Sequence, residues 1–244
     1  KDPEVGDVLI FNYPRDKYVK YVKRCIAGPG DTLVIQNKQV YLNGVLTELP
    51  ENYVFSQPEL PKTMKQKAVY LSSELNINKD NMGPIIIPKK GDYFKIDKNT
   101  NWRELLPIMM MEGNKAELKG NQKTFIFTLQ DPFELDRRKN HPSVFEPYFG
   151  YGNGNLITPW SRQILDNHFQ YLVINGKPIA DWEGYEVKQN YYWAMGDNRD
   201  DSLDSRYWGL IPENFILGEA LFAYFSLDLR SWIPRFDRIG TIID

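Results

Sequence analysis

The sequence contains one cysteine and two histidines among 244 residues, so it has few of the side chains that bind transition metals. Cys25 has no second cysteine with which to form a disulfide within the chain, and we expect it to be a small buried residue. His141 and His168 lie far apart, with no second ligand at a spacing typical of zinc sites. We therefore predict that the protein uses no metal and no other cofactor.

Long hydrophobic runs are also lacking. A membrane-spanning helix needs about 20 apolar residues, and the longest candidate here, residues 220–227, has only the length of a strand. No signal peptide is recognisable either. Because the chain begins with Lys1-Asp2-Pro3-Glu4 rather than with methionine, we interpret it as a piece of a longer protein.

Neither sign of charge is in large excess. The formal net charge is −2, which gives no electrostatic reason to expect nucleic acid as a partner. The sequence is instead rich in aromatic residues, glycine and proline, with 15 Tyr, 13 Phe, 17 Gly and 16 Pro. This composition favours strands and turns over helices, and the length suffices for one large or two smaller domains.

Short strands and tight turns dominate the first 45 residues. Residues 8–11 and 18–26 are runs of apolar and β-branched side chains, each followed by turn residues. Residues 32–35 and 39–42 flank Gln36-Asn37-Lys38 in the manner of a hairpin. The dipeptide Asn43-Gly44 then predicts a second turn, and the same strand-and-turn chemistry returns at residues 171–176.

The middle of the chain is less regular. Apolar residues recur at helical spacing between Trp102 and Glu112, which predicts one helix there. Residues 186–195 are predicted to form one further strand. We predict a mostly β protein of short antiparallel strands, in which residues 1–45 and 171–244 form the main β domain and residues 46–170 an inserted, smaller α+β domain.

Two polar segments stand out from this background. Residues 21–31 carry Lys23 and Arg24 side by side on a predicted strand, where adjacent side chains point to opposite faces, so the two cannot do the same work. Residues 195–209 concentrate Asp, Asn, Arg and Ser in a loop between two strands. A loop this polar fixes its own shape by ion pairs and by bonds from side chains to backbone, as a functional loop requires.

These segments resemble the conserved boxes of bacterial signal peptidase I (leader peptidase), a family of membrane-bound serine–lysine proteases. Residues 23–31 resemble its lysine box, K-R-x-x-G-x-P-G-D, and residues 196–206 its box G-D-N-R-D-N-S-x-D-S-R. Residues 5–11 and 237–240 resemble its R-G-D-hydrophobic box and its closing residues. Several long boxes in the right order are far more specific than one short motif. The resemblance implies that the main β domain is the catalytic domain.

The resemblance makes Lys23 the general base. A lysine acts as a base only when it is neutral, although its free pKa is about 10.4. Burial in a dry cleft, and the neighbouring positive charge of Arg24, would both lower that pKa. Ser202 matches the second active-site serine of the family, whose hydroxyl would hold the lysine amine in position.

Other residues of the two boxes would support this pair. We expect Asp197 to pair with Arg24, and Asp204 to pair with Arg206, which fixes the shape of the loop. The chain departs from the family pattern at Asp201, where Asn is usual. A carboxylate that pointed toward Lys23 would raise the pKa of the lysine.

The resemblance also implies a substrate and a location. Tyr21 and Val22 precede Lys23 on a strand that would pair with an extended peptide, with shallow pockets for small side chains, and Ile10 would line the same pockets. The partners implied are the signal peptides of exported preproteins and a lipid surface, and not nucleic acid. The enzyme would act on the outer face of the bacterial cytoplasmic membrane.

The nucleophile of the family is missing from the printed residues. The family places it in an S-x-M-x-P box upstream of the R-G-D-like stretch, and no such box occurs here. The serines at positions 56, 72, 73, 143 and 161 lack that context, and no S-x-x-K pattern is present. We therefore expect the nucleophilic serine to precede Lys1, and the printed residues alone to be inactive.

Plainer interpretations remain open for each feature. Lys23 and Arg24 alone would suit a solvated edge strand, and Ser202 alone a loop cap. The Asp-rich loop lacks the spacing of an EF-hand calcium site. Near the end of the chain, Trp232, Ile233 and Phe236 suit a core and a lipid-facing rim equally. For the whole protein, the alternatives are a noncatalytic homologue that binds peptides, and a self-cleaving serine–lysine regulator.

Overall fold

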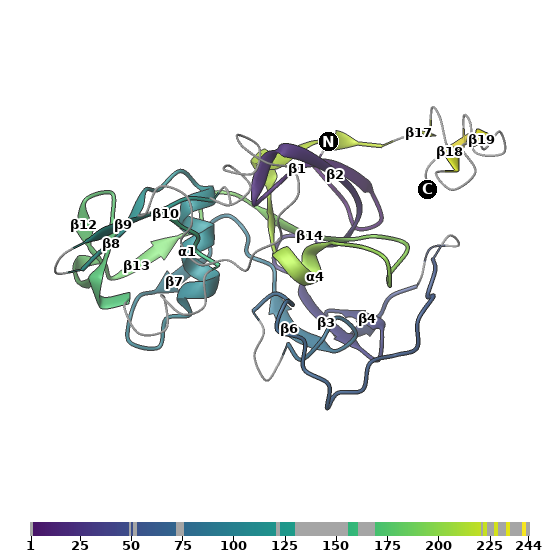
Figure 1. The fold of residues 1–244 in the computed structure, drawn as a ribbon, viewed down its shortest axis with the longest axis horizontal. Helices are drawn as coiled ribbons and strands as arrows, with labels where there is room; N and C mark the ends of the chain where they lie inside the picture. The colour runs from purple at the N-terminus through teal and green to yellow at the C-terminus, as the bar shows by residue number, and fades with distance from the viewer. Residues whose placement is uncertain are drawn as a thin grey trace. The chain divides into compact units, whose positions relative to one another are not determined.

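The computed structural model describes residues 2–48, 50, 53–71, 76–120, 123–129, 156–160 and 169–220, together with four two-residue strands beyond residue 220. Strands make up most of its regular structure, and nearly all of their pairings are antiparallel (Figure 1). The prediction of a mostly β protein is confirmed.

The chain forms two compact units. Unit 1 contains residues 1–12, 20–87 and 191–244, and unit 2 contains residues 13–19 and 88–190. The predicted inserted domain, residues 46–170, stays a prediction. The division into two units follows contacts within the structure, and it places residues 46–87 in unit 1 and residues 171–190 in unit 2.

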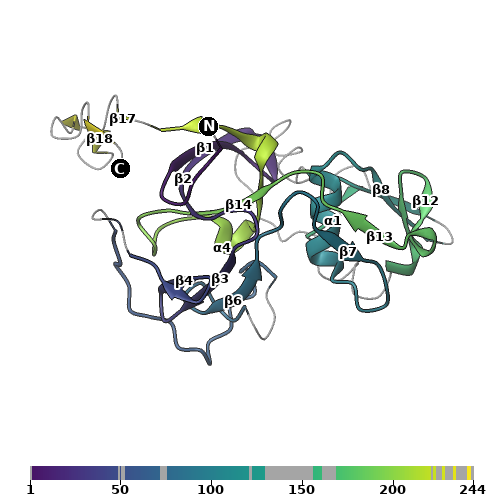
Figure 2. The same ribbon diagram turned by 180° about the vertical axis from the view of Figure 1, so that it is seen from behind.

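The first sheet of unit 1 carries both polar segments. Its strands have the order β15-β14-β2-β1-β16, and β1, β2 and β14 are seen together in both views (Figures 1 and 2). Leu9 and Phe11 of β1 are buried and alternate with more exposed residues, as in a strand with one covered face. The bounds are β1 Val8–Tyr13, β2 Asp16–Ala27, β14 Tyr191–Met195, β15 Ile211–Pro212 and β16 Ile216–Glu219.

The pairing of β14 with β2 determines where the second polar segment begins. Every residue of β14 is buried. Met195 lies opposite Arg24, and Ala194 opposite Cys25. The loop that follows Met195 therefore starts beside Lys23, and the helix α4 (Ser205–Trp208) and the 3₁₀ helix η3 (Glu213–Phe215) come after it.

The second sheet of unit 1 has the order β5-β4-β3-β6. Both turns between its first three strands have positive φ at the two central residues: Asn37 at 53° and Lys38 at 66°, then Asn43 at 54° and Gly44 at 81°. Such turns match the twist of a tight hairpin, which confirms both predicted turns. The bounds are β3 Thr32–Gln36, β4 Gln39–Leu42, β5 Val45–Leu46 and β6 Met82–Ile86.

Unit 2 contains the helix α1 (Trp102–Met111), whose predicted position is confirmed to within one residue. Leu105, Leu106, Met109 and Met110 are buried, as their spacing predicted. Its sheets have the orders β10-β9-β8-β11-β12 and β13-β7. The remaining elements are β7 Tyr93–Lys95, β8 Ala116–Lys119, β9 Thr124–Phe127, β10 Leu156–Ile157, η1 Phe169–Tyr171, β11 Leu172–Ile174, β12 Lys177–Pro178, η2 Ile179–Asp181 and β13 Gly184–Glu186.

The prediction of one strand over residues 186–195 is wrong. Strand β13 ends at Glu186 and β14 begins at Tyr191. Between them, the backbone N–H groups of Lys188 and Gln189 donate to Glu112 Oε1 at 3.0 and 3.3 Å. Because these donors bind a side chain, they are not available to a neighbouring strand.

No helix among the described residues is long and apolar enough to cross a membrane. The last strands are β17 Phe222–Ala223, β18 Leu227–Asp228, β19 Ile233–Pro234 and β20 Thr241–Ile242, which pair as β17 with β20 and β18 with β19. Several residues that the sequence singled out lie outside the described ones: Ser72, Ser73, His141, Ser143, Ser161, His168, Trp232, Phe236 and residues 237–240.

Candidate active site

Strand β2 separates the two basic side chains of the first polar segment. Lys23 is half-buried and Arg24 is buried. Lys23 Nζ donates a hydrogen bond to Ser202 Oγ at 2.9 Å, although 179 positions separate the two residues in the sequence. The structure therefore brings together the two residues to which the resemblance gives catalytic roles, and those roles stay a prediction.

The surroundings of Lys23 shift its pKa toward the neutral amine. Burial has the largest influence and lowers the pKa of Lys23; the charge of Asp204 opposes this shift, and the charge of Arg206 adds to it. The net pKa is lower than that of a free lysine. A neutral amine is what a general base requires.

Gly196 leaves the space in which this pair meets. A Cβ atom at position 196 would lie 2.2 Å from Ser202 Oγ and 2.7 Å from Ser202 Cβ. It would also lie 3.4 Å from Lys23 Nζ. The first residue of the loop therefore has to lack a side chain for Ser202 to reach the lysine.

Arg24 holds the beginning of the loop. Its Nε and Nη2 atoms donate to the two carboxylate oxygens of Asp197, both at 2.9 Å, and its Nη1 donates to the carbonyl oxygen of Gly6 at 2.7 Å. A two-pronged contact of this kind fixes orientation as well as distance. The expected ion pair of Asp197 with Arg24 is present.

Asp204 holds the end of the loop. It accepts the backbone N–H of Gly196 at 3.1 Å, and so ties the end of the loop to its beginning. It also caps α4 by accepting the backbone N–H of Arg206. The guanidinium of Arg206 donates to both Asp204 oxygens, at 2.9 and 2.8 Å, and both side chains are buried. The expected pair of Asp204 with Arg206 is therefore also present.

The residues predicted to bind substrate lie on neighbouring strands of the first sheet. Ile10 in β1 and Tyr21 in β2 are half-buried, and Val22 is 53% exposed. The ring of Tyr21 packs against Trp208, with ring centroids 4.9 Å apart. Their binding role stays a prediction.

The other residues that the sequence singled out have simpler surroundings. Asp201 is exposed, and among the charges that raise the pKa of Lys23 it comes after Asp204 and Asp197. Cys25 is fully buried, and burial raises the pKa of its thiol to about 12. Among the described residues, no group of three or more His, Cys, Asp or Glu side chains could hold a metal ion.

Sequence reasoning missed three contributors to this site. Gly196 was part of the matched box, but its role becomes visible only when Ser202 is placed. Asp200 within the loop received no role, and neither did residues 53–57, which form hydrogen bonds with the loop. The density of Asp and Arg in the loop was a signal that ion pairs would form, although it could not name their partners.

Comparison with known proteins identifies the family. A model described as signal peptidase, peptidase S26, matches residues 1–101 and 138–225. Signal peptidase I of Haemophilus influenzae is 30% identical over 250 residues, which cover 98% of this chain and 65% of that protein. Signal peptidase I of Buchnera aphidicola subsp. Baizongia pistaciae is 26% identical over 244 residues, with 98% and 62% covered.

The chain thus spans less than two thirds of the length of these relatives. A crystal structure of a signal peptidase I from Enterococcus faecalis V583 covers 90% of this chain and 97% of its own, at 18% identity. Its TM-score of 0.32 is too low to support a statement about the fold. The family model, however, matches well over half of the residues, and on that basis this chain belongs to the signal peptidase S26 family.

Proposed function

We propose that the full-length protein is a signal peptidase I, an endopeptidase that removes signal peptides from exported preproteins with a serine–lysine pair. Family membership supports the reaction class. The observation that carries the mechanism is the 2.9 Å hydrogen bond from Lys23 Nζ to Ser202 Oγ. A lysine that is half-buried and held by a hydroxyl group is suited to act as a base.

In this mechanism Lys23 moves the proton in both steps. Its neutral amine takes the proton of the nucleophilic serine as that Oγ attacks the scissile carbonyl carbon. The Lys23 ammonium then gives this proton to the leaving amine as the C–N bond breaks, which leaves an acyl-enzyme ester. In the second step Lys23 deprotonates a water molecule that attacks the ester, and the serine leaves with the proton.

The nucleophilic serine belongs, in this proposal, to the S-x-M-x-P box that the family places upstream of the R-G-D-like stretch, and we expect that box before Lys1. Ser202 then has a different task. Its hydroxyl fixes the direction of the Lys23 amine, while Asp197 and Asp204 hold the ends of the loop that presents Ser202.

The proposed substrate is an extended peptide that pairs with the edge of the site near Tyr21 and Val22. Small residues before the scissile bond, as in the Ala-x-Ala pattern of signal peptide cleavage sites, would fill shallow pockets to which Ile10 contributes. The proposed location is the outer face of the bacterial cytoplasmic membrane, with the lipid surface as a second partner.

The test is cleavage of a preprotein by the full-length protein in detergent micelles. We expect one cut after the small residues of the signal peptide, and no cut with the Lys23→Ala variant. Lys23→Arg should fail as well, because a guanidinium stays protonated near neutral pH. Lys20→Ala removes an exposed lysine of the same strand and serves as the matched control, with wild-type turnover expected.

Three outcomes would contradict this proposal. Unchanged turnover in Lys23→Ala would refute Lys23 as the base. Binding of signal peptides without any cleavage by the wild-type protein would favour the noncatalytic homologue. Cleavage within its own chain, with no cleavage of preproteins, would favour the self-cleaving regulator.

A further inference from the structure

Residues 53–57, which we call the strap, run beside the loop that carries Ser202. The backbone N–H of Val54 donates to the carbonyl oxygen of Asp197 at 3.0 Å, and the N–H of Arg199 donates to the carbonyl oxygen of Val54 at 3.0 Å. Val54 and Asn198 form a parallel β-bridge. The ring of Tyr53 lies under the buried guanidinium of Arg199, with 4.0 Å between the ring centroid and Cζ. The strap therefore follows the loop along its first residues.

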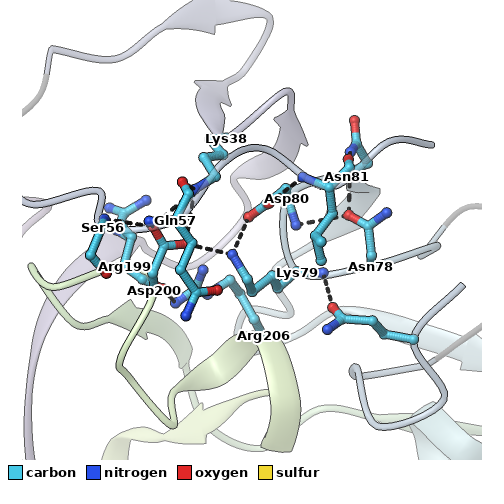
Figure 3. Close-up of polar contacts among 12 residues, drawn as sticks. Lys38, Ser56, Gln57, Asn78, Lys79, Asp80, Asn81, Arg199, Asp200 and Arg206 are labelled. Atoms are coloured by element: carbon cyan, nitrogen blue, oxygen red, sulfur yellow. Dashed lines mark hydrogen bonds and ion pairs between the residues drawn. The ribbon is translucent and has the colours of Figure 1, made fainter. Parts of the chain in front are cut away.

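Asp200, a residue of the loop, also binds the strap. Its carboxylate accepts the backbone N–H groups of Ser56 and Gln57, both at 2.8 Å. It also accepts Lys38 Nζ on both oxygens at 2.9 Å, and Lys79 Nζ at 2.5 Å (Figure 3). The Asp200 side chain has no exposed surface. One buried carboxylate thus joins the loop to three other segments of unit 1.

The two lysines lie in the β3–β4 turn of the second sheet and in the segment that leads into β6. Lys38 occupies the β3–β4 turn at φ 66°, and its Nζ also donates to the carbonyl oxygen of Gln57 at 2.7 Å. Lys79 lies just before β6 and pairs with Asp80 at 2.9 Å. Two ammonium groups therefore face two carboxylates, so the buried cluster is balanced in charge.

Pairing favours the charged forms of Asp200 and Lys79. Burial alone would raise the pKa of Asp200, but the hydrogen bonds from Lys79 and Lys38 outweigh it and hold the pKa well below its usual value. Burial likewise acts to lower the pKa of Lys79, but its bonds to Asp200 and Asp80 prevail and raise it. Asp200 and Lys79 therefore hold each other as an ion pair inside the cluster.

Ser202 lies midway between two anchored carboxylates, Asp200 two residues before it and Asp204 two residues after it. We propose that Asp200, through Lys38, Lys79 and the strap, is a positioning residue that holds Ser202 against Lys23. This inference rests on the proposed function, because it assigns a role in the same site. Asp204 connects the end of the loop to the beginning of the loop and to α4. Asp200 connects the loop to the second sheet and its connections, through Lys38 and Lys79.

Loss of this anchor has a signature in the pH profile. When Ser202 moves away, water reaches Lys23, and the pKa of Lys23 rises because burial is the main influence that lowers it. The acidic limb of kcat/KM then moves to higher pH. If Asp200 lost its negative charge and Ser202 stayed in place, the pKa of Lys23 would fall instead, and the acidic limb of kcat/KM would shift to lower pH. Among the described residues, the charged groups that act on Lys23 include Asp197, Asp201, Asp204 and Arg206 from the loop and α4, and the ring of Tyr21 lies near it on its own strand.

The test is the full-length Asp200→Asn variant with a preprotein substrate. The amide has one acceptor oxygen instead of two and no charge, so its NH2 group would face either the two lysines or the N–H groups of the strap. The two buried ammonium groups would then share the single carboxylate of Asp80. We expect kcat to fall about 10- to 100-fold, as for a misplacement of about 1 Å, with KM nearly unchanged and the acidic limb at higher pH. Asp80→Asn is the matched control: it removes a buried carboxylate from the same cluster, and Asp80 bonds Lys79 and the backbone of Leu60, not the loop. It should lower the melting temperature and leave the limb in place.

Lys38→Met serves if Asp200→Asn does not fold, because it removes one lysine and leaves Asp200 bound to Lys79 and the strap. It should move the limb in the same direction. A folded Asp200→Asn or Lys38→Met protein with wild-type kcat and an unshifted or lowered limb would overturn the inference. A titration of the Lys23 amine by NMR in 13C-lysine-labelled protein gives the same answer without any cleavage, so the inference stays testable even if the wild-type protein cuts no preprotein.

Discussion

The Gly196→Ala substitution tests the geometry of the candidate site with a single methyl group. The added Cβ would lie 2.2 Å from Ser202 Oγ, whereas ordinary contacts begin at 3.4 Å. Rotation of the Ser202 side chain could relieve that contact. It would leave the 2.7 Å contact with Ser202 Cβ, so the loop itself has to move.

The expected loss follows from this displacement. A shift of about 1 Å in a positioning group costs about 100-fold in rate, which corresponds to about 2.7 kcal/mol of transition-state stabilisation. Overpacking at a site of this kind costs a further 1–3 kcal/mol of folding stability, roughly. Gly196 does not have a positive φ, so the loss would come from the contact with Ser202 and not from backbone strain.

The assay is preprotein cleavage by the full-length protein, with kcat and KM measured separately. Gly218→Ala is the control, because a Cβ at position 218 meets nothing within 4 Å and that residue also lacks a positive φ. In a Ser202→Ala background the 2.2 Å contact disappears, so Gly196→Ala should cost less there than in the wild type. A fully active and stable Gly196→Ala protein would refute the placement of Ser202 against Lys23.

Two further predictions concern titration and reactivity. Asp201 raises the pKa of Lys23, so Asp201→Asn should lower that pKa and move the acidic limb of the kcat/KM profile to lower pH. The shift should be small because Asp201 is exposed. An acidic limb that moves to higher pH would contradict this reasoning. Cys25 is fully buried and the pKa of its thiol is raised to about 12. Iodoacetamide should therefore label Cys25 only after denaturation. Rapid labelling of the folded protein, detected by mass spectrometry, would disprove the burial.

Much of the site could be predicted from the sequence because the two boxes are contiguous. Within each box, spacing along a strand or a short loop fixes which side chains are neighbours. The pair of Asp204 with Arg206 followed from this proximity and from charge. The pair of Asp197 with Arg24 spans 173 positions, and it was expected from the family resemblance. The turns at Asn43-Gly44 and Asn175-Gly176 were predictable from local sequence, since both residues of each turn have positive φ.

The remainder could not be predicted because it depends on contacts between distant segments. Lys38 stands in a turn where a solvated side chain would be ordinary, yet its residue is only 9% exposed because Asp200 lies within reach. The strap has four consecutive exposed residues, at positions 54–57, and its backbone N–H and C=O groups form its hydrogen bonds with the loop. Glu112 accepts a backbone N–H group from within the strand predicted over residues 186–195, although more than 70 positions separate it from Lys188. Local pattern carries no information on such partners.

The loop places many carboxylates near Lys23, which the proposed mechanism requires to be neutral, and ion pairs offset most of these charges. Aspartates beside Lys23 would each raise its pKa, and the loop contains four, at positions 197, 200, 201 and 204. Three of them are held by cations: Asp197 by Arg24, Asp200 by Lys38 and Lys79, and Asp204 by Arg206. Asp201 is exposed, so water screens its charge. Burial therefore outweighs the carboxylates at Lys23 and its pKa is lowered. The ion pairs that hold the loop also offset three of the carboxylate charges that would act against the proposed base.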